Sequence, residues 1–271
     1  MKLCRIYCEG KRGSLDYDIL EKVLGDLRPN IEIKPVGGKR EAKSIIGYIE
    51  NSVSDFAVAK ADAYLLFRDR DFDAPVPNQV QLTQQGHVYF SYRTTIENYL
   101  IDSQLFFEYA IEKGIRELDT VEKAKSIIRD SALEIKNYQA VRHALGALRV
   151  DTSFRTSWTE QDGKLPECLE LEACMDSAFN LIREAKTKSE NWTKKHFEEK
   201  VREFLMVFND SFFDREEYLV WFQGKDLAKS ICRKMDNFPM KAYYKFAESR
   251  FDYKKFADLV ELRTIVENKI Q

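Results

Sequence analysis

Asp69, Asp71 and Asp73 stand at alternate positions just beyond the short apolar run 64–67, separated from it only by Arg68. A second apolar run, near the N-terminus, ends on Glu9. Carboxylates held close together repel one another unless a cation neutralises them. Because carboxylate oxygens are the ligands that Mg²⁺ prefers, the pattern predicts a divalent-metal site and, with it, phosphate chemistry.

Two neighbouring parallel strands would bring these acids to the same edge of a sheet, where α/β proteins bind their ligands. In the first hundred residues, segments with the apolar pattern of a strand alternate with segments that have the apolar spacing of a helix. Strands are expected over 2–8, 31–36, 63–67 and 87–91, and helices over 14–27 and 40–53. Strands separated by helices of this length pair in parallel with right-handed crossovers. We therefore expect an α/β fold whose mostly parallel sheet is flanked by helices.

After Tyr99 the spacing of apolar residues becomes helical. Helices are expected over 103–113, 120–148, 165–185, 193–209, 216–221, 225–235 and 253–269. The change predicts two parts, a metal-binding catalytic domain over 1–101 and a mainly helical region over 102–271. The second part would serve dimerisation, substrate selection or docking of a partner.

The composition is that of a globular protein, with 44% hydrophobic and 32% charged residues and no apolar run near the roughly 20 residues of a membrane span. The N-terminus lacks the features of a signal peptide, so we expect a cytoplasmic protein. The five cysteines are odd in number and form no Cys-x-x-Cys pair, which argues against a zinc site or a disulfide framework. A net charge of -2 does not favour nucleic-acid binding, although local basic patches remain compatible with it.

Other sites that use Asp-x-Asp fit less well. A calcium loop of EF-hand type would need glycine and glutamate where this chain has Ala74 and Val80. A phosphatase of the haloacid dehalogenase type carries the motif on its first strand, whereas here it follows the third expected strand. A polar turn that caps a strand is the simplest structural alternative.

The combination of motifs resembles a known domain. Glu9-Gly10 after one apolar strand, Asp69-x-Asp71 after a later strand and the alternation between them resemble the TOPRIM domain of topoisomerases, primases and OLD-family nucleases, over residues 1–101. Residues 95–100 read Thr-Ile-Glu-Asn-Tyr-Leu and resemble the signature of small OLD-like TOPRIM proteins of bacterial defence. That group includes the TOPRIM effector of PARIS-type anti-phage systems, which acts with an ABC-type ATPase.

The resemblance implies roles for individual acids. Glu9, Asp69 and Asp71 match the TOPRIM acids and would be the core metal ligands. The aspartate often found four residues after the glutamate is replaced by Gly13. Asp16 lies nearby and is equally well explained as a ligand or as an acid in the first turn of a helix. The outer candidate ligands are Asp73 and Glu97.

The resemblance also implies a basic catalytic residue. Residues 221–226 resemble the late Gly-Lys segment of OLD-type proteins, which makes Lys225 the candidate to neutralise charge in the transition state. An exposed lysine at a helix start explains the residue equally well.

Taken together, the motifs predict a Mg²⁺-dependent endonuclease, in which Mn²⁺ can substitute. It would cleave tRNA, other RNA or DNA, work as a homodimer and act as a defence effector with an ABC-type ATPase partner. The alternative is a TOPRIM-shaped regulatory module that binds a metal or a basic protein surface without cleavage. A third reading, nucleotidyl transfer by a primase, lacks the accessory motifs expected for it.

Overall fold

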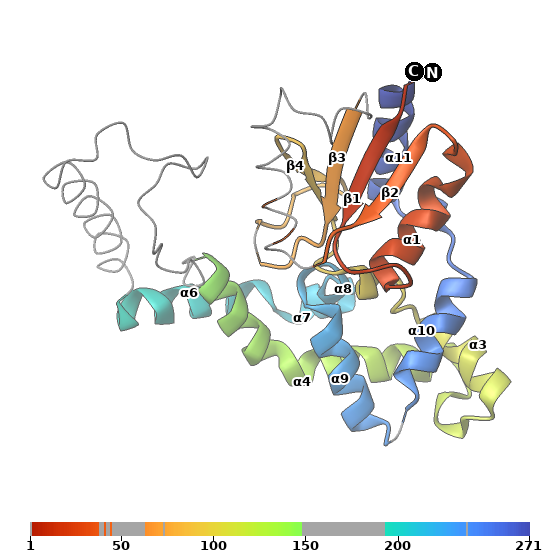
Figure 1. Ribbon diagram of the computed structural model, residues 1–271. Helices are drawn as coiled ribbons and strands as arrows, with labels where there is room; N and C mark the ends of the chain where they lie inside the picture. The colour runs from red at the N-terminus through yellow and green to blue at the C-terminus, as the bar shows by residue number, and fades with distance from the viewer. Residues whose placement is uncertain are drawn as a thin grey trace, which may run out of the picture. The chain divides into compact units, whose positions relative to one another are not determined.

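The computed structural model describes residues 2–37, 41, 44, 63–72, 74–147, 193–236 and 238–271. Within these residues a five-stranded sheet has the order β2-β1-β3-β5-β4. β2, β1 and β3 lie side by side in Figure 1. β1 pairs in parallel with β2 and β3, β3 pairs in parallel with β5, and β4 runs antiparallel to β5. The strands are β1 (Cys4–Cys8), β2 (Ile31–Pro35), β3 (Ala63–Arg68), β4 (Thr83–Gln85) and β5 (Val88–Phe90). The expected α/β fold with a mostly parallel sheet flanked by helices is confirmed.

β1 is an interior strand of the sheet, between β2 and β3. All five of its residues are buried, as expected of a strand covered on both faces, and its one charged residue, Arg5, pairs with Glu32 of β2 at 2.9 Å. Cys8 at its end is level with Phe67 in β3 and with Pro35 in β2. β1 and β3 therefore end almost side by side, and the acids that follow each strand emerge at the same edge of the sheet.

The four expected strands are confirmed, with ends shifted by one to two residues. β4 was not expected, because its sequence Thr-Gln-Gln has no apolar residue to indicate a strand. It forms a hairpin with β5 through Gly86, whose φ of 59° suits a tight turn. The helix expected over 40–53 falls outside the described residues, except that residues 41 and 44 are helical.

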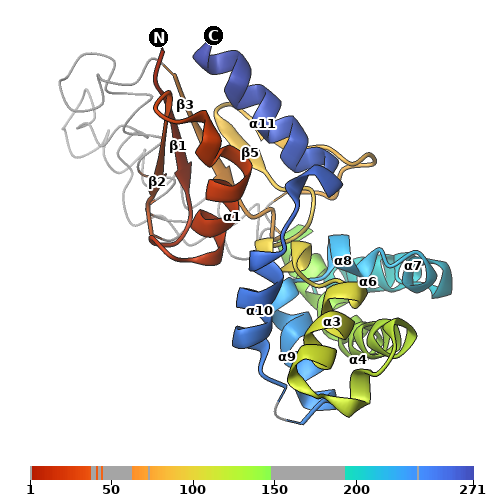
Figure 2. The same cartoon turned by 90° about the vertical axis from the view of Figure 1, so that its right-hand side faces the viewer.

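Helices α1 (Leu15–Leu24) and α11 (Ala257–Ile270) pack against each other and against the sheet (Figure 2). α1 buries Ile19, Leu20, Val23 and Leu24 at the spacing of one helix face and continues into a 3₁₀ turn, η1 (Gly25–Leu27). The C-terminal helix thus belongs to the layer that covers the N-terminal strands.

The chain forms two compact units, one of Met1–Lys136 with Asn209–Gln271 and one of Asn137–Phe208. The domain boundary expected at residue 101 falls inside the first unit, so the sheet shares one compact unit with many of the later helices. In that unit lie η2 (Ile96–Tyr99), α3 (Ser103–Lys113), η3 (Arg116–Leu118), α7 (Asp210–Asp214), α8 (Tyr218–Trp221), α9 (Gly224–Lys234), α10 (Met240–Ser249) and η4 (Tyr253–Lys255). α4 (Val121–Ala147) contributes to both units.

An aromatic cluster holds α3 and α10 together. Phe106 of α3 packs against Tyr243 of α10 with ring centroids 4.0 Å apart and against Phe238 at 5.2 Å. α10 was not expected, although Tyr243, Phe246 and Ala247 are buried at helical spacing. Among the other expected helices, that over 103–113 is confirmed with the expected ends and the rest are confirmed with shifted ends. The helix expected over 165–185 falls outside the described residues.

The second unit is described over 137–147 and 193–208. α6 (Lys194–Val207) begins after Thr193, whose hydroxyl accepts a hydrogen bond from the His196 amide at 3.1 Å. The His143 ring of α4 packs 5.0 Å from Phe204 and 5.7 Å from Phe208. No helix in the described part of either unit is long and apolar enough to cross a membrane.

Candidate metal centre

The turn after β1 places two of the predicted acids at the edge of the sheet. Gly10 follows Glu9 with a φ of 85°, and a Cβ at this position would lie 2.4 Å from Ser14 Oγ and 3.7 Å from Asp16 Oδ2. Only glycine fits both the backbone conformation and the close approach of the helix start. The tight turn therefore brings Asp16, in the first turn of α1, back beside the end of β1.

The loop after β3 fixes the other two core acids. Asp69 is buried, and its Oδ1 accepts a hydrogen bond of 2.8 Å from the Ile96 amide at the start of η2. Asp71 is also buried and has a φ of 45°, which aspartate tolerates better than most residues. Its amide donates to Thr94 O at 2.7 Å. The Asp69 carboxylate and the Asp71 backbone are thus held against the segment that leads into η2.

An arginine of β3 engages the glutamate of β1. Arg68 Nε donates to Glu9 Oε1 at 2.9 Å, and only 3% of the Arg68 side chain is exposed. Its guanidinium also lies over the Phe90 ring, 5.3 Å from the centroid. Such a charge-assisted bond in a buried setting fixes the Glu9 carboxylate in one orientation.

Arg70, between the two aspartates, is a buried cation satisfied by oxygens from distant segments. It donates to Tyr92 O at 3.2 Å, Ala74 O at 3.4 Å, Thr94 Oγ1 at 3.0 Å and Val220 O at 2.7 Å. Burial lowers the pKa of Arg70 to about 10, so it stays charged at neutral pH. Arg70 therefore ties the loop after β3 to the end of α8.

The residues of η2 and the start of α9 interlock, and we call residues 94–98 the clamp. Asn98 Nδ2 donates to Phe222 O at 3.0 Å, while Thr95 Oγ1 accepts from the Gly224 amide at 3.1 Å. Asn98 Oδ1 in turn accepts from the Thr95 amide and hydroxyl. A Cβ on Gly224 would lie 2.7 Å from Asn98 Oδ1 and 2.8 Å from Thr95 Oγ1. Only glycine permits this close approach.

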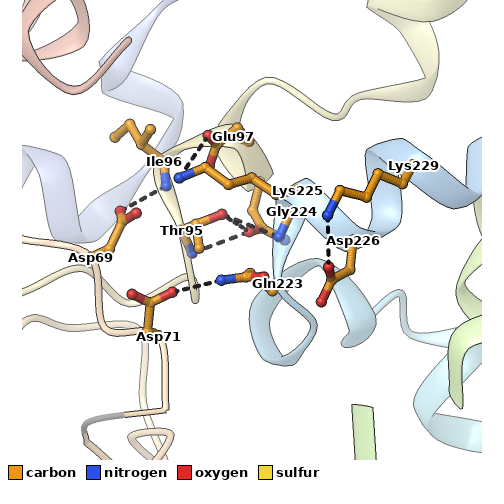
Figure 3. Close-up of polar contacts among 11 residues, drawn as sticks. Asp69, Asp71, Thr95, Ile96, Glu97, Gln223, Gly224, Lys225, Asp226 and Lys229 are labelled. Carbon is orange, nitrogen blue, oxygen red and sulfur yellow. Dashed lines mark hydrogen bonds and ion pairs between the residues drawn. The ribbon is translucent and has the colours of Figure 1, made fainter. Parts of the chain in front are cut away.

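Because the clamp holds the start of α9, two side chains from that segment, Gln223 and Lys225, contact the acids (Figure 3). Gln223 Nε2 donates to Asp71 Oδ1 at 3.2 Å, and Lys225 Nζ lies 3.6 Å from Glu97 Oε1. Burial lowers the pKa of Lys225, but the carboxylates, above all Glu97 and Asp69, outweigh it and raise the pKa overall. Lys225 is therefore a cation at neutral pH.

The carboxylates at this edge act on one another electrostatically. Burial raises the pKa of Asp69 well above its usual range, and negative charge on neighbouring acids adds to the effect. Burial, followed by the charges of Glu97 and Glu9, raises the pKa of Asp16 to about 7. We call this group the acidic edge; it consists of Glu9, Asp16, Asp69, Asp71 and Glu97.

The donor set of the acidic edge suits a hard cation. Glu97 Oε2 is buried and has no hydrogen-bond partner among the described residues, which is costly for a carboxylate oxygen. No group of three or more His, Cys, Asp or Glu side chains in the described part of the chain is arranged to hold a metal ion. Glu9, Asp69 and Asp71 each accept a hydrogen bond that limits how the carboxylate can turn. A cation would therefore have to draw these carboxylates together to ligating distance while the hydrogen bonds restrict their orientation.

Comparison with known proteins assigns no family to this chain. No protein-family model matches it, and no curated protein matches it. The TOPRIM resemblance remains an expectation from the motifs, and any function must rest on the chemistry of the acidic edge.

The acidic edge, together with Lys225, gathers most of the predicted site residues in one place. Asp73 lies outside the described residues. The sequence motifs assigned no role to the supporting residues Arg68, Arg70, Thr95, Asn98 and Gln223, although the last three lie within the motif segments. Gln223 precedes the Gly-Lys pair and could have been noticed there, whereas the arginines show their role only through contacts across the fold.

Proposed function

We propose that this chain is a Mg²⁺-dependent nuclease of TOPRIM type that hydrolyses phosphodiester bonds in tRNA, other RNA or DNA. In this proposal it is the toxic effector of a bacterial anti-phage system, works in the cytoplasm as a homodimer and is controlled by an ABC-type ATPase. The observation that carries the catalytic part is the position of Lys225, with its Nζ 3.6 Å from Glu97 Oε1. A cation and a set of buried acids converge there from segments far apart in the sequence.

The acids would hold the metal. Glu9, Asp69 and Asp71 supply anionic oxygens from two strand ends, and Glu97 contributes a buried oxygen that lacks a partner among the described residues. Mg²⁺ commonly keeps several waters, so a few carboxylates are enough and leave room for a phosphate. When bound, the ion would supply electrostatic stabilisation of the charge that develops at the phosphate.

Lys225 would bind the substrate. Its side chain is 60% exposed, so the ammonium group can reach a phosphate from solvent while it stays next to Glu97. A cation fixed at this point stabilises negative charge on a phosphate oxygen without a change in its own protonation. The clamp keeps the start of α9 in place and so limits the positions that the ammonium can take.

One observation favours the alternative of a regulatory module. The Glu9 carboxylate is engaged by the buried Arg68, and a metal would have to compete with that bond. A protein with this arrangement could use the acidic edge to bind Mg²⁺ weakly, or to bind a basic protein surface, without cleavage.

The experiment is a cleavage assay with purified protein on total tRNA, plasmid and single-stranded DNA, in Mg²⁺, Mn²⁺ or EDTA. Glu9→Ala is compared with Glu32→Ala, because Glu32 also accepts a 2.9 Å bond from an arginine Nε within the same sheet. We expect metal-dependent cleavage by the wild type and by Glu32→Ala, and a loss of about 100-fold or more in Glu9→Ala.

Cleavage in EDTA, or undiminished cleavage by Glu9→Ala, would contradict the proposal. Absence of cleavage by folded protein that binds Mg²⁺ would favour the regulatory module. The substrate that is cut distinguishes RNA from DNA.

A further inference from the structure

Gln223 contacts the acidic edge, yet none of the motifs gives it a role. Its Nε2 donates to Asp71 Oδ1 at 3.2 Å across 152 positions of sequence (Figure 3). Glutamine is a long, flexible side chain, so a contact of this kind on an open surface would mean little. The contact gains weight here because both backbones are anchored.

The Gln223 backbone is fixed on both sides. The preceding carbonyl, of Phe222, accepts from Asn98 Nδ2, and the following amide, of Gly224, donates to Thr95 Oγ1. Gln223 itself is extended, with φ -68° and ψ 123°, and it occupies the N-cap position of α9 without a capping bond from its side chain. Its side chain therefore leaves the backbone from a defined point beside the clamp.

The Asp71 backbone is fixed as well. Its amide donates to Thr94 O at 2.7 Å, and the neighbouring Arg70 binds Thr94 Oγ1 and Val220 O. The same clamp therefore holds both partners of the contact between Gln223 and Asp71.

The chemistry of the donor sets its effect. An amide carries no charge, so it orients a carboxylate without neutralising it. Glu9, the acid that follows β1, is instead bound by the cation Arg68, which compensates its negative charge. Polar groups that orient metal ligands in this way typically change metal affinity by about 10–100-fold when removed.

We propose that Gln223 is a positioning residue, which orients the Asp71 carboxylate toward a divalent cation while leaving its negative charge available. This inference rests on the metal site of the proposed function. It adds a residue that acts on the metal through Asp71 and does not itself bind the ion.

The test measures Mn²⁺ binding by isothermal titration calorimetry. Gln223→Met keeps the length of the side chain and removes the amide donor. Gln104→Met is the matched control, because Gln104 Nε2 also donates to a carboxylate, that of Glu108, but on the exposed face of α3. We expect affinity for Mn²⁺ to fall by roughly 10-fold in Gln223→Met and to stay unchanged in Gln104→Met.

A double-mutant cycle separates positioning from a general effect on the fold. In an Asp71→Ala background, Gln223→Met should cause no further loss of Mn²⁺ affinity, because its partner is already absent. Melting temperatures of all variants are measured without metal, and Gln223→Ala replaces Gln223→Met should the latter not fold.

Unchanged Mn²⁺ affinity in the Gln223 variant, with binding intact in the wild type, would overturn this inference alone. An additional loss in the Asp71→Ala background would also overturn it. Absence of Mn²⁺ binding by the folded wild type would overturn both the inference and the metal site of the proposed function.

Discussion

Two charged regions of the first unit use the same kinds of side chain to opposite effect. Where α11 meets the end of α1, Arg263 Nη1 and Nη2 bind the Asp26 carboxylate at 2.6 and 2.9 Å, and Nε binds Glu267 at 2.9 Å. The bond to Arg263 lowers the pKa of Asp26. At the acidic edge, burial and neighbouring acids instead raise the pKa of Asp69 and Asp16.

The sign of the pKa shift separates the two regions. An acid with a lowered pKa carries a charge that stabilises the folded state. An acid with a raised pKa carries a charge that destabilises it, because the folded state favours the protonated form. Perturbed carboxylates of the second kind gather at functional sites, because the chemistry needs them there. The helix contact is therefore structural, and the acidic edge is the place where a ligand would relieve repulsion.

The largest expected effect comes from removal of the cation at the acidic edge. Lys225→Ala should reduce cleavage by about 100-fold, because a substrate phosphate loses a fixed positive charge. Lys229→Ala is the control, since Lys229 lies one turn later in α9, is 79% exposed and pairs with Asp226. Single-turnover cleavage rates check the prediction, and equal effects of the two variants would refute a special role for Lys225.

A smaller effect is expected from a change that disturbs the clamp. Gly224→Ala should lower the free energy of unfolding by about 1–3 kcal/mol, because its Cβ would press on Asn98 and Thr95. Gly25→Ala is the control, since the added Cβ would meet only the flexible end of Glu21, at 3.1 Å. Urea unfolding measures both. Similar stabilities of the two variants would mean that the clamp tolerates displacement.

The smallest expected effect is a difference in pH dependence between the two regions. Folding raises the pKa of Asp16 from its usual 3.8 to about 7. The contribution of Asp16 to the free energy of unfolding therefore falls as the pH rises between these two pKa values. Asp16→Asn should therefore gain stability relative to wild type between about pH 5 and 7.5 in EDTA. Asp26→Asn should show a constant deficit over this range, because the pKa of Asp26 is lowered from its usual 3.8 and the carboxylate stays charged throughout.

Urea unfolding at the two pH values checks this prediction. If the free energies of unfolding of Asp16→Asn and wild type changed in parallel with pH, the charge on Asp16 would not be repelled by the other acids of the acidic edge.

Local patterns in the sequence were sufficient for the strand ends and their acids. An apolar run followed directly by carboxylates defines both the strand and the point where it ends, so the order of residues alone places Glu9, Asp69 and Asp71. β4 was missed because an edge strand of three residues needs no apolar side chain. α10 was missed because it begins directly after Pro239, at a break in the helical spacing.

The supporting residues could not be predicted because their partners are distant in sequence. Arg70 looks like one more charged residue until Val220 is brought next to it. Thr95 and Asn98 matched a signature, but the signature does not state that they hold the start of α9. Gln223 lies next to Asp71 only because Thr95 and Asn98 hold the start of α9, so its position could not be predicted from the sequence either.

The most direct measurement of the central claim is the melting temperature of wild type and Asp69→Asn as Mg²⁺ is added at constant ionic strength. The Asn side chain can still accept the hydrogen bond from the Ile96 amide but lacks the charge. We predict that the wild-type melting temperature rises with Mg²⁺ concentration, as ligand binding to the folded state requires, and that Asp69→Asn does not respond. An unresponsive wild type, or an equal rise in Asp69→Asn, would contradict the acidic edge as a metal centre.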